Sequence, residues 1–102
     1  MIDKIKERYK IEKLSIELEQ VLSDNYIVGP NKRKLTKEDI FMANEELGVD
    51  FQAYGLIPII DIYDNDFICY QIHNNKWCVF NIVDEMSFCK DSSLSNLIKF
   101  KE

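Results

Sequence analysis

The chain has 102 residues, of which 46% are hydrophobic and 30% are charged, and its formal net charge is −5. This size and composition predict one domain with a hydrophobic core over residues 1–102 and exclude a disordered chain. The acidic balance argues against nucleic acid as the main partner, because phosphate binding needs a cationic surface, and it is compatible with a basic protein partner.

The first predicted element is a helix over residues 3–23. Apolar residues recur there at three- and four-residue steps, while Lys, Arg and Glu fill the other faces, as on an amphipathic surface helix. The polar face mixes acids with bases, so attachment to an anionic membrane is not expected. The apolar positions are Ile11, Leu14, Leu18, Val21 and Leu22.

The cellular compartment is predicted from two features. The first 23 residues are charged throughout and have no continuous apolar h-region, and no run of the chain approaches membrane-spanning length. The three cysteines are odd in number and have no paired spacing, so they do not form a disulfide framework. We therefore expect a cytoplasmic protein without a membrane partner.

Residues 25–34 are predicted to form a loop, and residues 36–47 a second helix. The loop carries most of the chain's only basic cluster, which we expect to be solvated. Thr36 suits the N-cap of the helix, and Asp39 stands where a carboxylate can bond back to the cap. Gly48 ends the helix, because glycine accepts the left-handed position after a helix at little cost.

Three consecutive strands follow a short connection and dominate the second half of the chain. They are predicted over residues 56–63, 67–73 and 77–83, and two short turns rich in Asn and Asp join them. Pro58 has no N–H, so the first strand should lie at an edge or meet a gap in the ladder.

A last short helix is predicted over residues 92–99, with Leu94, Leu97 and Ile98 as its buried side. The fold class is therefore α+β: an antiparallel sheet of at least three strands with helices packed against it. Because both faces of the strands carry apolar residues, we expect one face to be covered by helices and the other to be partly covered or used for contact.

Catalytic groups are sparse in the sequence. His73 is the only histidine, and no Cys or carboxylate stands at zinc-ligand spacing from it. Cys69 is on the same strand but roughly 13 Å away by the rise per residue, which is too far for a nucleophile and its base. The chain also has no glycine-rich phosphate loop. We therefore expect no catalytic residues, no metal and no cofactor.

Acidic residues gather around the turns of the predicted sheet. They are open to three interpretations: turn chemistry, an acidic contact surface or a metal site, although the Gly and bidentate Glu of a calcium loop are absent. The single tryptophan is expected either in the core or, at a sheet surface, as an interface anchor. The candidate partner-binding residues are Asp61, Tyr63, Asp64, Asp66, Trp77, Asp84 and Glu85.

The order of elements from residue 36 to residue 98 resembles a known family. A helix with an Asn in its middle, Asn44, precedes the strand Leu56-Ile57-Pro58-Ile59. A polar turn leads into Phe67-Ile68-Cys69-Tyr70, a third strand follows, and a Ser-rich start precedes Leu97-Ile98. This pattern is similar to the SUKH superfamily, the Smi/Knr-like immunity domains of bacterial toxin systems. The N-terminal Leu-Pro and the Asn-Gly-Gly common in that family are absent here.

The resemblance implies a noncatalytic α+β domain that binds and neutralises a cognate toxin, often a nuclease. The alternative is a small intracellular regulatory or scaffolding module that binds proteins. A third interpretation is an enzyme with carboxylate chemistry at Asp61 and Asp66. The toxin, the binding face and the oligomeric state are left open.

Overall fold

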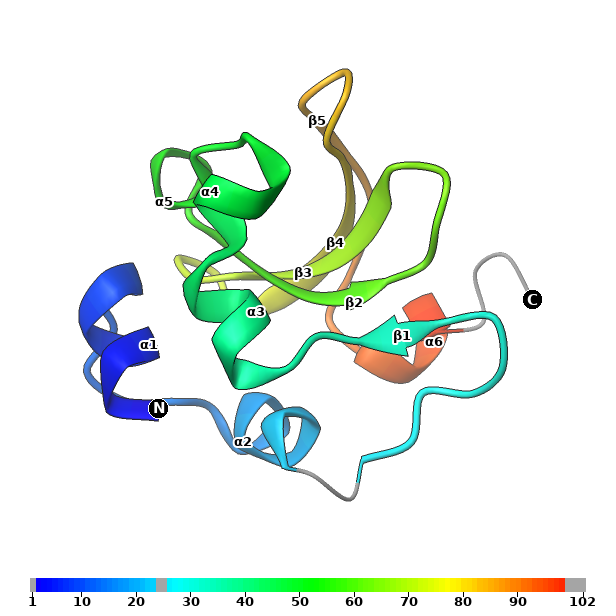
Figure 1. The fold of residues 1–102 in the computed structure, drawn as a ribbon. Coiled ribbons are helices and arrows are strands. Elements are labelled where there is room, and N and C mark those ends of the chain that lie inside the picture. The colour runs from blue at the N-terminus through cyan, green and yellow to red at the C-terminus, as the bar shows by residue number, and fades with distance from the viewer. Residues whose placement is uncertain (1, 24–25, 99–102) are drawn as a thin grey trace.

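The computed structural model describes residues 2–23 and 26–98 and has the predicted α+β architecture (Figure 1). Its centre is a five-stranded antiparallel sheet in the order β1-β2-β3-β4-β5. The strands are β1 (Arg33–Lys34), β2 (Leu56–Asp61), β3 (Asp66–Gln71), β4 (Lys76–Asn81) and β5 (Met86–Asp91). The helices are α1 (Ile2–Tyr9), α2 (Ile16–Leu22), α3 (Lys37–Phe41), α4 (Ala43–Leu47), α5 (Phe51–Tyr54) and α6 (Leu94–Ile98).

The three predicted strands are confirmed as β2, β3 and β4, and each ends two residues earlier than predicted. The turns take up the difference. Tyr63, Asp64 and Asn65 all have positive φ, which ends β2 because a strand needs extended backbone. At the end of β4, the Asn81 side chain accepts hydrogen bonds from the next backbone N–H groups at 3.0 and 2.9 Å. Asn and Asp thus form the turns by the mechanism expected from the sequence.

Pro58 lies in β2 at a gap in the ladder, as predicted. The Ile72 N–H donates a hydrogen bond of 2.9 Å to the Gly55 carbonyl. Along this part of β2, the N–H and C=O groups of every second residue after Gly55 therefore point toward β3, and those of the residues between them point away. In that alternation the nitrogen of Pro58 faces away from β3, so its missing N–H removes no bond there. The outer neighbour β1 pairs with β2 only at Ile60 and Asp61. Pro58 therefore lies on a stretch of β2 that β1 does not cover.

The single helix predicted over residues 3–23 is wrong, because the chain breaks it into α1 and α2. Lys10 follows α1 with φ of 56°, and the Ile11 N–H bonds back to the Lys6 carbonyl at 3.0 Å. These are the left-handed residue and the long bond of a Schellman C-cap. Ser15 then caps α2 by accepting a hydrogen bond from the Leu18 N–H at 3.2 Å. The apolar spacing continues across the break because both helices bury their stripes in the same core.

The second predicted helix, 36–47, is bent at Met42 into α3 and α4. Its predicted ends are confirmed: Thr36 and Asp39 form a capping box, and Gly48 is left-handed with φ of 69°. The connection after it contains a further short helix, α5, which the sequence analysis did not predict. The predicted loop 25–34 ends in the short strand β1. Residue 99, the last of the predicted C-terminal helix, lies outside the described residues.

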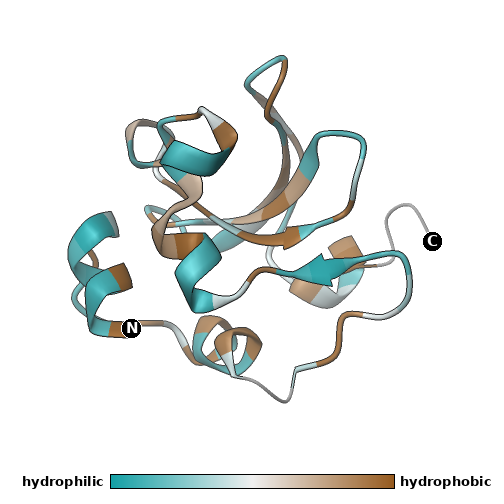
Figure 2. Ribbon diagram, in the orientation of Figure 1, coloured by the Kyte–Doolittle hydropathy of each residue, from teal (hydrophilic) through white to brown (hydrophobic). Residues whose placement is uncertain are grey.

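Helices cover both faces of the sheet, so the central strands β3 and β4 are apolar between their polar end residues (Figures 1 and 2). On one face, the rings of Phe51 and Tyr54 from α5 lie 5.8 and 5.2 Å from the Phe80 ring. On the other face, the Trp77 indole donates a hydrogen bond to Glu17 of α2, and α6 contacts β4 and β5. The buried side chains form one cluster. Of the expected core residues Leu14, Leu18, Ile40, Phe41, Ile57, Ile68, Phe80, Ile82 and Leu97, only Phe41 and Ile82 are half-buried rather than buried.

Candidate functional site

Two turns lie side by side at one end of the sheet. They are residues 62–65, between β2 and β3, and residues 82–85, between β4 and β5; we call them, with the strand residues that flank them, the acidic end (Figure 1). The Ile82 N–H bonds to the Asn65 carbonyl at 2.9 Å and ties the two turns together. An antiparallel meander returns every second turn to the same end of the sheet, which explains this proximity.

The acidic end concentrates negative charge. Asp64, Asp84 and Glu85 are exposed, and Asp61 is half-buried with the Arg33 guanidinium 3.9 Å from its carboxylate. The longer sequence context is also acidic, since residues 38–89 contain ten acidic residues and one basic residue, Lys76. Residues 1–37, in contrast, contain nine basic and six acidic residues. The chain is therefore electrically polarised along its length.

Exposed apolar side chains accompany this charge. Seven large hydrophobic residues are exposed among the described residues, and five of them lie at the acidic end, on β5 or on α5 beside it. Their exposed fractions are 46% for Tyr54, 48% for Tyr63, 68% for Val83, 64% for Met86 and 37% for Phe88. Exposed Tyr, Phe and Met side chains are typical of a protein interface, whereas a small-molecule site is a concave, mostly apolar cleft.

The turns of the acidic end are held by hydrogen bonds. Asp61 accepts from the Tyr63 N–H at 2.8 Å, and the Tyr54 hydroxyl donates to the Glu85 carboxylate at 2.8 Å. This bond to Glu85 raises the pKa of the Tyr54 hydroxyl. Because Tyr54 also stacks on the buried Phe80 ring, the Glu85 carboxylate is positioned by the core through one aromatic side chain.

Two of the predicted partner-binding residues are not at the surface. Trp77 is fully buried, with its ring 5.0 Å from that of Tyr70 in an edge-to-face pair. Its prediction as a surface anchor is therefore wrong, and the core alternative is correct. Asp66 is 6% exposed and accepts a hydrogen bond from Asn81 at 2.8 Å, so it supports the turns from inside. The structure places the other five candidates, Asp61, Tyr63, Asp64, Asp84 and Glu85, at the acidic end.

Sequence reasoning missed Tyr54, Val83 and Met86. The sequence contains one signal that indicates where negative charge concentrates: residues 38–75 contain no Lys or Arg. The exposure of the three apolar side chains had no such signal, because it depends on the unpredicted α5 and β5.

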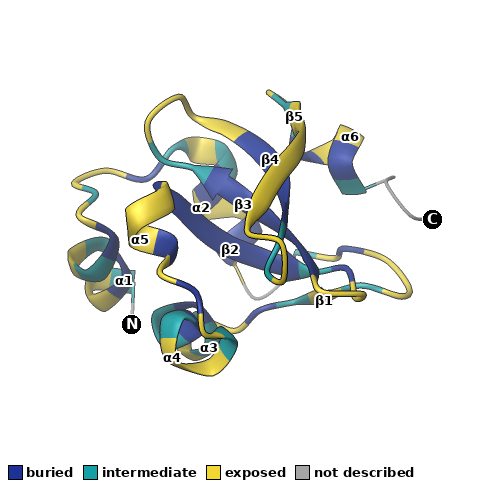
Figure 3. Ribbon diagram, turned by 90° about the horizontal axis from the view of Figure 1, so that it is seen from above, coloured by how far each residue is buried: buried dark blue, intermediate teal, exposed yellow. Residues whose placement is uncertain are grey.

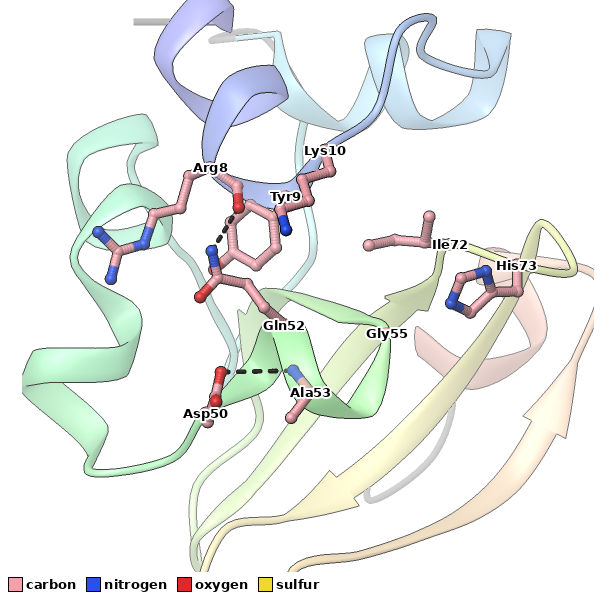
Figure 4. A pocket seen from close by; sticks show the side chains of 9 residues that line it. All are labelled: Arg8, Tyr9, Lys10, Asp50, Gln52, Ala53, Gly55, Ile72 and His73. Atoms are coloured by element: carbon pink, nitrogen blue, oxygen red, sulfur yellow. Dashed lines mark hydrogen bonds between the residues drawn. The ribbon is translucent and has the colours of Figure 1, made fainter.

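A pocket of about 440 Å³ lies elsewhere, between α1, α5 and the end of β3 (Figure 4). Two hydrogen bonds lie at this pocket, one between α5 and α1 and one within the N-cap of α5. The Gln52 amide donates to the Arg8 carbonyl, and Asp50 accepts from the Ala53 N–H at 3.3 Å. His73 lies against Gly55, where an added Cβ would meet the imidazole at 2.9 Å. The close contact between Gly55 and His73 thus packs the end of α5 against the end of β3.

Two searches of the described residues bear on other kinds of site. In residues 2–23 and 26–98, His, Cys, Asp and Glu side chains do not gather in any group of three or more that could hold a metal ion. Over the same ranges, every helix is too short or too polar to cross a bilayer.

The chain was also compared with known proteins. Comparison with protein-family models, with curated proteins and with solved structures gives no match. The resemblance of residues 36–98 to the SUKH superfamily therefore stays a prediction, and the functional proposal depends on the geometry of the acidic end.

Proposed function

We propose that this chain is a noncatalytic immunity protein that binds a basic bacterial toxin through the acidic end. The observation that carries the proposal is the pair of hydrogen-bonded turns, where four exposed or half-buried acidic residues adjoin most of the exposed large apolar side chains. The resemblance to the SUKH superfamily supplies the biological setting, a cognate toxin, and nuclease is the class of toxin it suggests. The cytoplasm is the compartment we propose, because an odd set of free cysteines suits a reducing environment.

The charge of the acidic end suits fast association with a cationic partner. The carboxylates gathered at the acidic end would attract a basic protein before contact and raise the association rate, and salt would screen this attraction. Hydrogen bonds from the Tyr63 N–H and the Tyr54 hydroxyl hold the carboxylates of Asp61 and Glu85 in place before binding. Binding then costs less conformational entropy than it would for mobile loops.

The exposed apolar side chains would govern how long the complex lasts. Aromatic and Met side chains are enriched in interface centres, where their burial slows dissociation. Tyr54, Tyr63 and Met86 are the candidate anchors. A nuclease must present a cationic surface to bind phosphates, so the acidic end would neutralise such a toxin by covering that surface.

A charge-neutralisation experiment tests the proposal. The triple variant Asp64→Asn, Asp84→Asn and Glu85→Gln removes three exposed charges from the acidic end, while Asp3→Asn, Glu12→Gln and Glu19→Gln removes three exposed charges from the N-terminal helices and the segment between them. Both triples change the net charge equally, so only position differs. The binding partner is the product of the neighbouring gene, or a protein captured from the source cells with the wild-type chain.

We expect the first triple to slow association at least about tenfold at low salt and the control triple to leave the rate near wild type. At high salt, the association rates of the wild type and of the two triple variants should become similar. Equal association rates for the two triples at low salt would refute the acidic end as the binding surface. The regulatory alternative would be favoured by two results together. The captured partners would be ordinary proteins of the source cell, and the neighbouring gene product would not harm cells.

A further inference from the structure

The outer edge of β5 is open. β5 is the last strand of the sheet, and within residues 2–23 and 26–98 its one strand neighbour is β4. Residues 86–90 are all exposed, and β5 is the exposed strand beside the buried β3 and β4 in Figure 3. An edge strand with free backbone groups is a template for pairing with another strand.

The hydrogen bonds of β4 fix which β5 groups point outward. The bond from the Ile82 N–H to the Asn65 carbonyl shows that even-numbered residues at this end of β4 face β3. In a strand, successive residues direct their N–H and C=O groups to opposite sides. Asn81 and Val79 therefore direct theirs toward β5.

Asn81 and Val79 pair with Met86 and Phe88, so these two residues of β5 bond to β4. Ser87, which lies between them in the chain, must direct its N–H and C=O away from the sheet. After Phe88 the ladder is interrupted, because the register shifts by one residue and Cys89 has φ of 53°. The open edge is thus short and centred on Ser87.

We infer that a second copy of this chain pairs with this edge, with the two β5 strands antiparallel and the twofold axis at Ser87. Each Ser87 would exchange both backbone hydrogen bonds with Ser87 of the second copy. Met86 of one copy would then lie beside Phe88 of the other, and these side chains are 64% and 37% exposed in the single chain. The product is a continuous sheet of two five-stranded halves.

The charges of the edge favour a second copy over a strand of unrelated sequence. Asp84 and Glu85 precede the open stretch, and Lys90 follows it. An antiparallel copy brings Lys90 toward the acidic turn of its neighbour, at both ends of the pairing. The two acidic ends then lie at opposite ends of the paired strands, which keeps like charges apart. β5 association itself needs no toxin, but the dimer would bury Met86, one of the candidate anchors of the acidic end, so toxin binding and dimerisation would compete for that side chain.

Sedimentation of the full chain tests the association. Because the paired stretch is short, we expect a weak, reversible dimer, so the mass should rise from one chain to two between about 10 µM and about 1 mM. Ser87→Pro removes an N–H that points outward and leaves the bonds to β4 in place, so this variant should stay a single chain. A wild-type chain that stays single at about 1 mM, or a Ser87→Pro dimer as tight as wild type, would overturn the inference.

A cross-linking experiment tests the register without depending on the proline variant. In a Cys78→Ala and Cys89→Ser background, which removes the thiol that contacts the Ser87 side chain and the exposed thiol of β5, Ser87→Cys should give a disulfide-linked dimer on treatment with diamide, which takes up the two thiol hydrogens. Directly paired residues lie about 5.5 Å apart between Cα atoms, within the span of a disulfide. The control Gln20→Cys places an exposed thiol on α2. We expect Ser87→Cys to cross-link at least about tenfold faster than the control, and equal rates would exclude the register.

Discussion

Replacing Phe80 with alanine should destabilise the fold more than any change to the surface. Phe80 is fully buried on β4, and it makes an edge-to-face contact with Phe51 and a tilted contact with Tyr54. A Phe-to-Ala change in a core costs about 3–5 kcal/mol, and aromatic pairs add about 0.5–1.5 kcal/mol each beyond burial. The loss should therefore lie in the upper half of the first range.

Such a loss is a large share of the roughly 5–15 kcal/mol that stabilises a domain of this kind. Urea unfolding followed by the fluorescence of Trp77, the single tryptophan, and by circular dichroism measures it. The control is Phe88→Ala on the neighbouring strand, where the side chain is 37% exposed and the expected loss is at most about 1 kcal/mol. A Phe80→Ala loss below about 1 kcal/mol would refute the packing described between α5 and the sheet.

Three further predictions concern single side chains. Lys10→Gly should raise the unfolding free energy by about 0.5–1 kcal/mol in thermal melts, because glycine accepts the left-handed C-cap without the Cβ penalty; a lower melting temperature would contradict the cap. Glu17→Ala should cost about 1–3 kcal/mol because it leaves the buried indole N–H of Trp77 unpaired, whereas Glu17→Gln, which keeps an acceptor, should cost less; equal losses would show that the bond does not matter. For Asp39, partial burial opposes ionisation, but hydrogen bonds from Thr36 and Arg33 outweigh it and hold the pKa below its ordinary value. The stability from this group is complete above the ordinary carboxyl pKa of about 4 and is lost as the pH falls through the lower folded pKa, so Asp39→Asn should show a smaller loss on acidification; parallel pH curves for the two proteins would contradict this.

The parts of the fold that sequence could predict are those with a strong local signal. Thr36, Asp39 and Gly48 give the start and end of the second helical segment because each residue type serves a specific capping geometry. The turns at the acidic end were predictable for the same reason, since Asn and Asp accept left-handed backbone and bond to nearby N–H groups.

The missed elements lack such signals. The left-handed residue that ends α1 is Lys10. A glycine at that position would have indicated a helix end, but a lysine does not, so the apolar spacing predicted one continuous helix. β5 is exposed along its length, so it has no buried face to produce an alternating pattern. Trp77 could not be assigned to core or surface, because both faces of β4 are apolar and only the position of α2 decides the question.

The two edges of the sheet differ in what they permit. On the β2 side, Pro58 presents a nitrogen without hydrogen, and β1 covers the neighbouring residues with only two of its own. Another chain that arrives there finds no regular row of donors and acceptors. The edge strand on this side, β1, has only two residues, so the proposed pairing at β5 uses the longer of the two edges. An assembly through β5 would stop at two copies, because each copy then presents only the two-residue β1 at its outer edge.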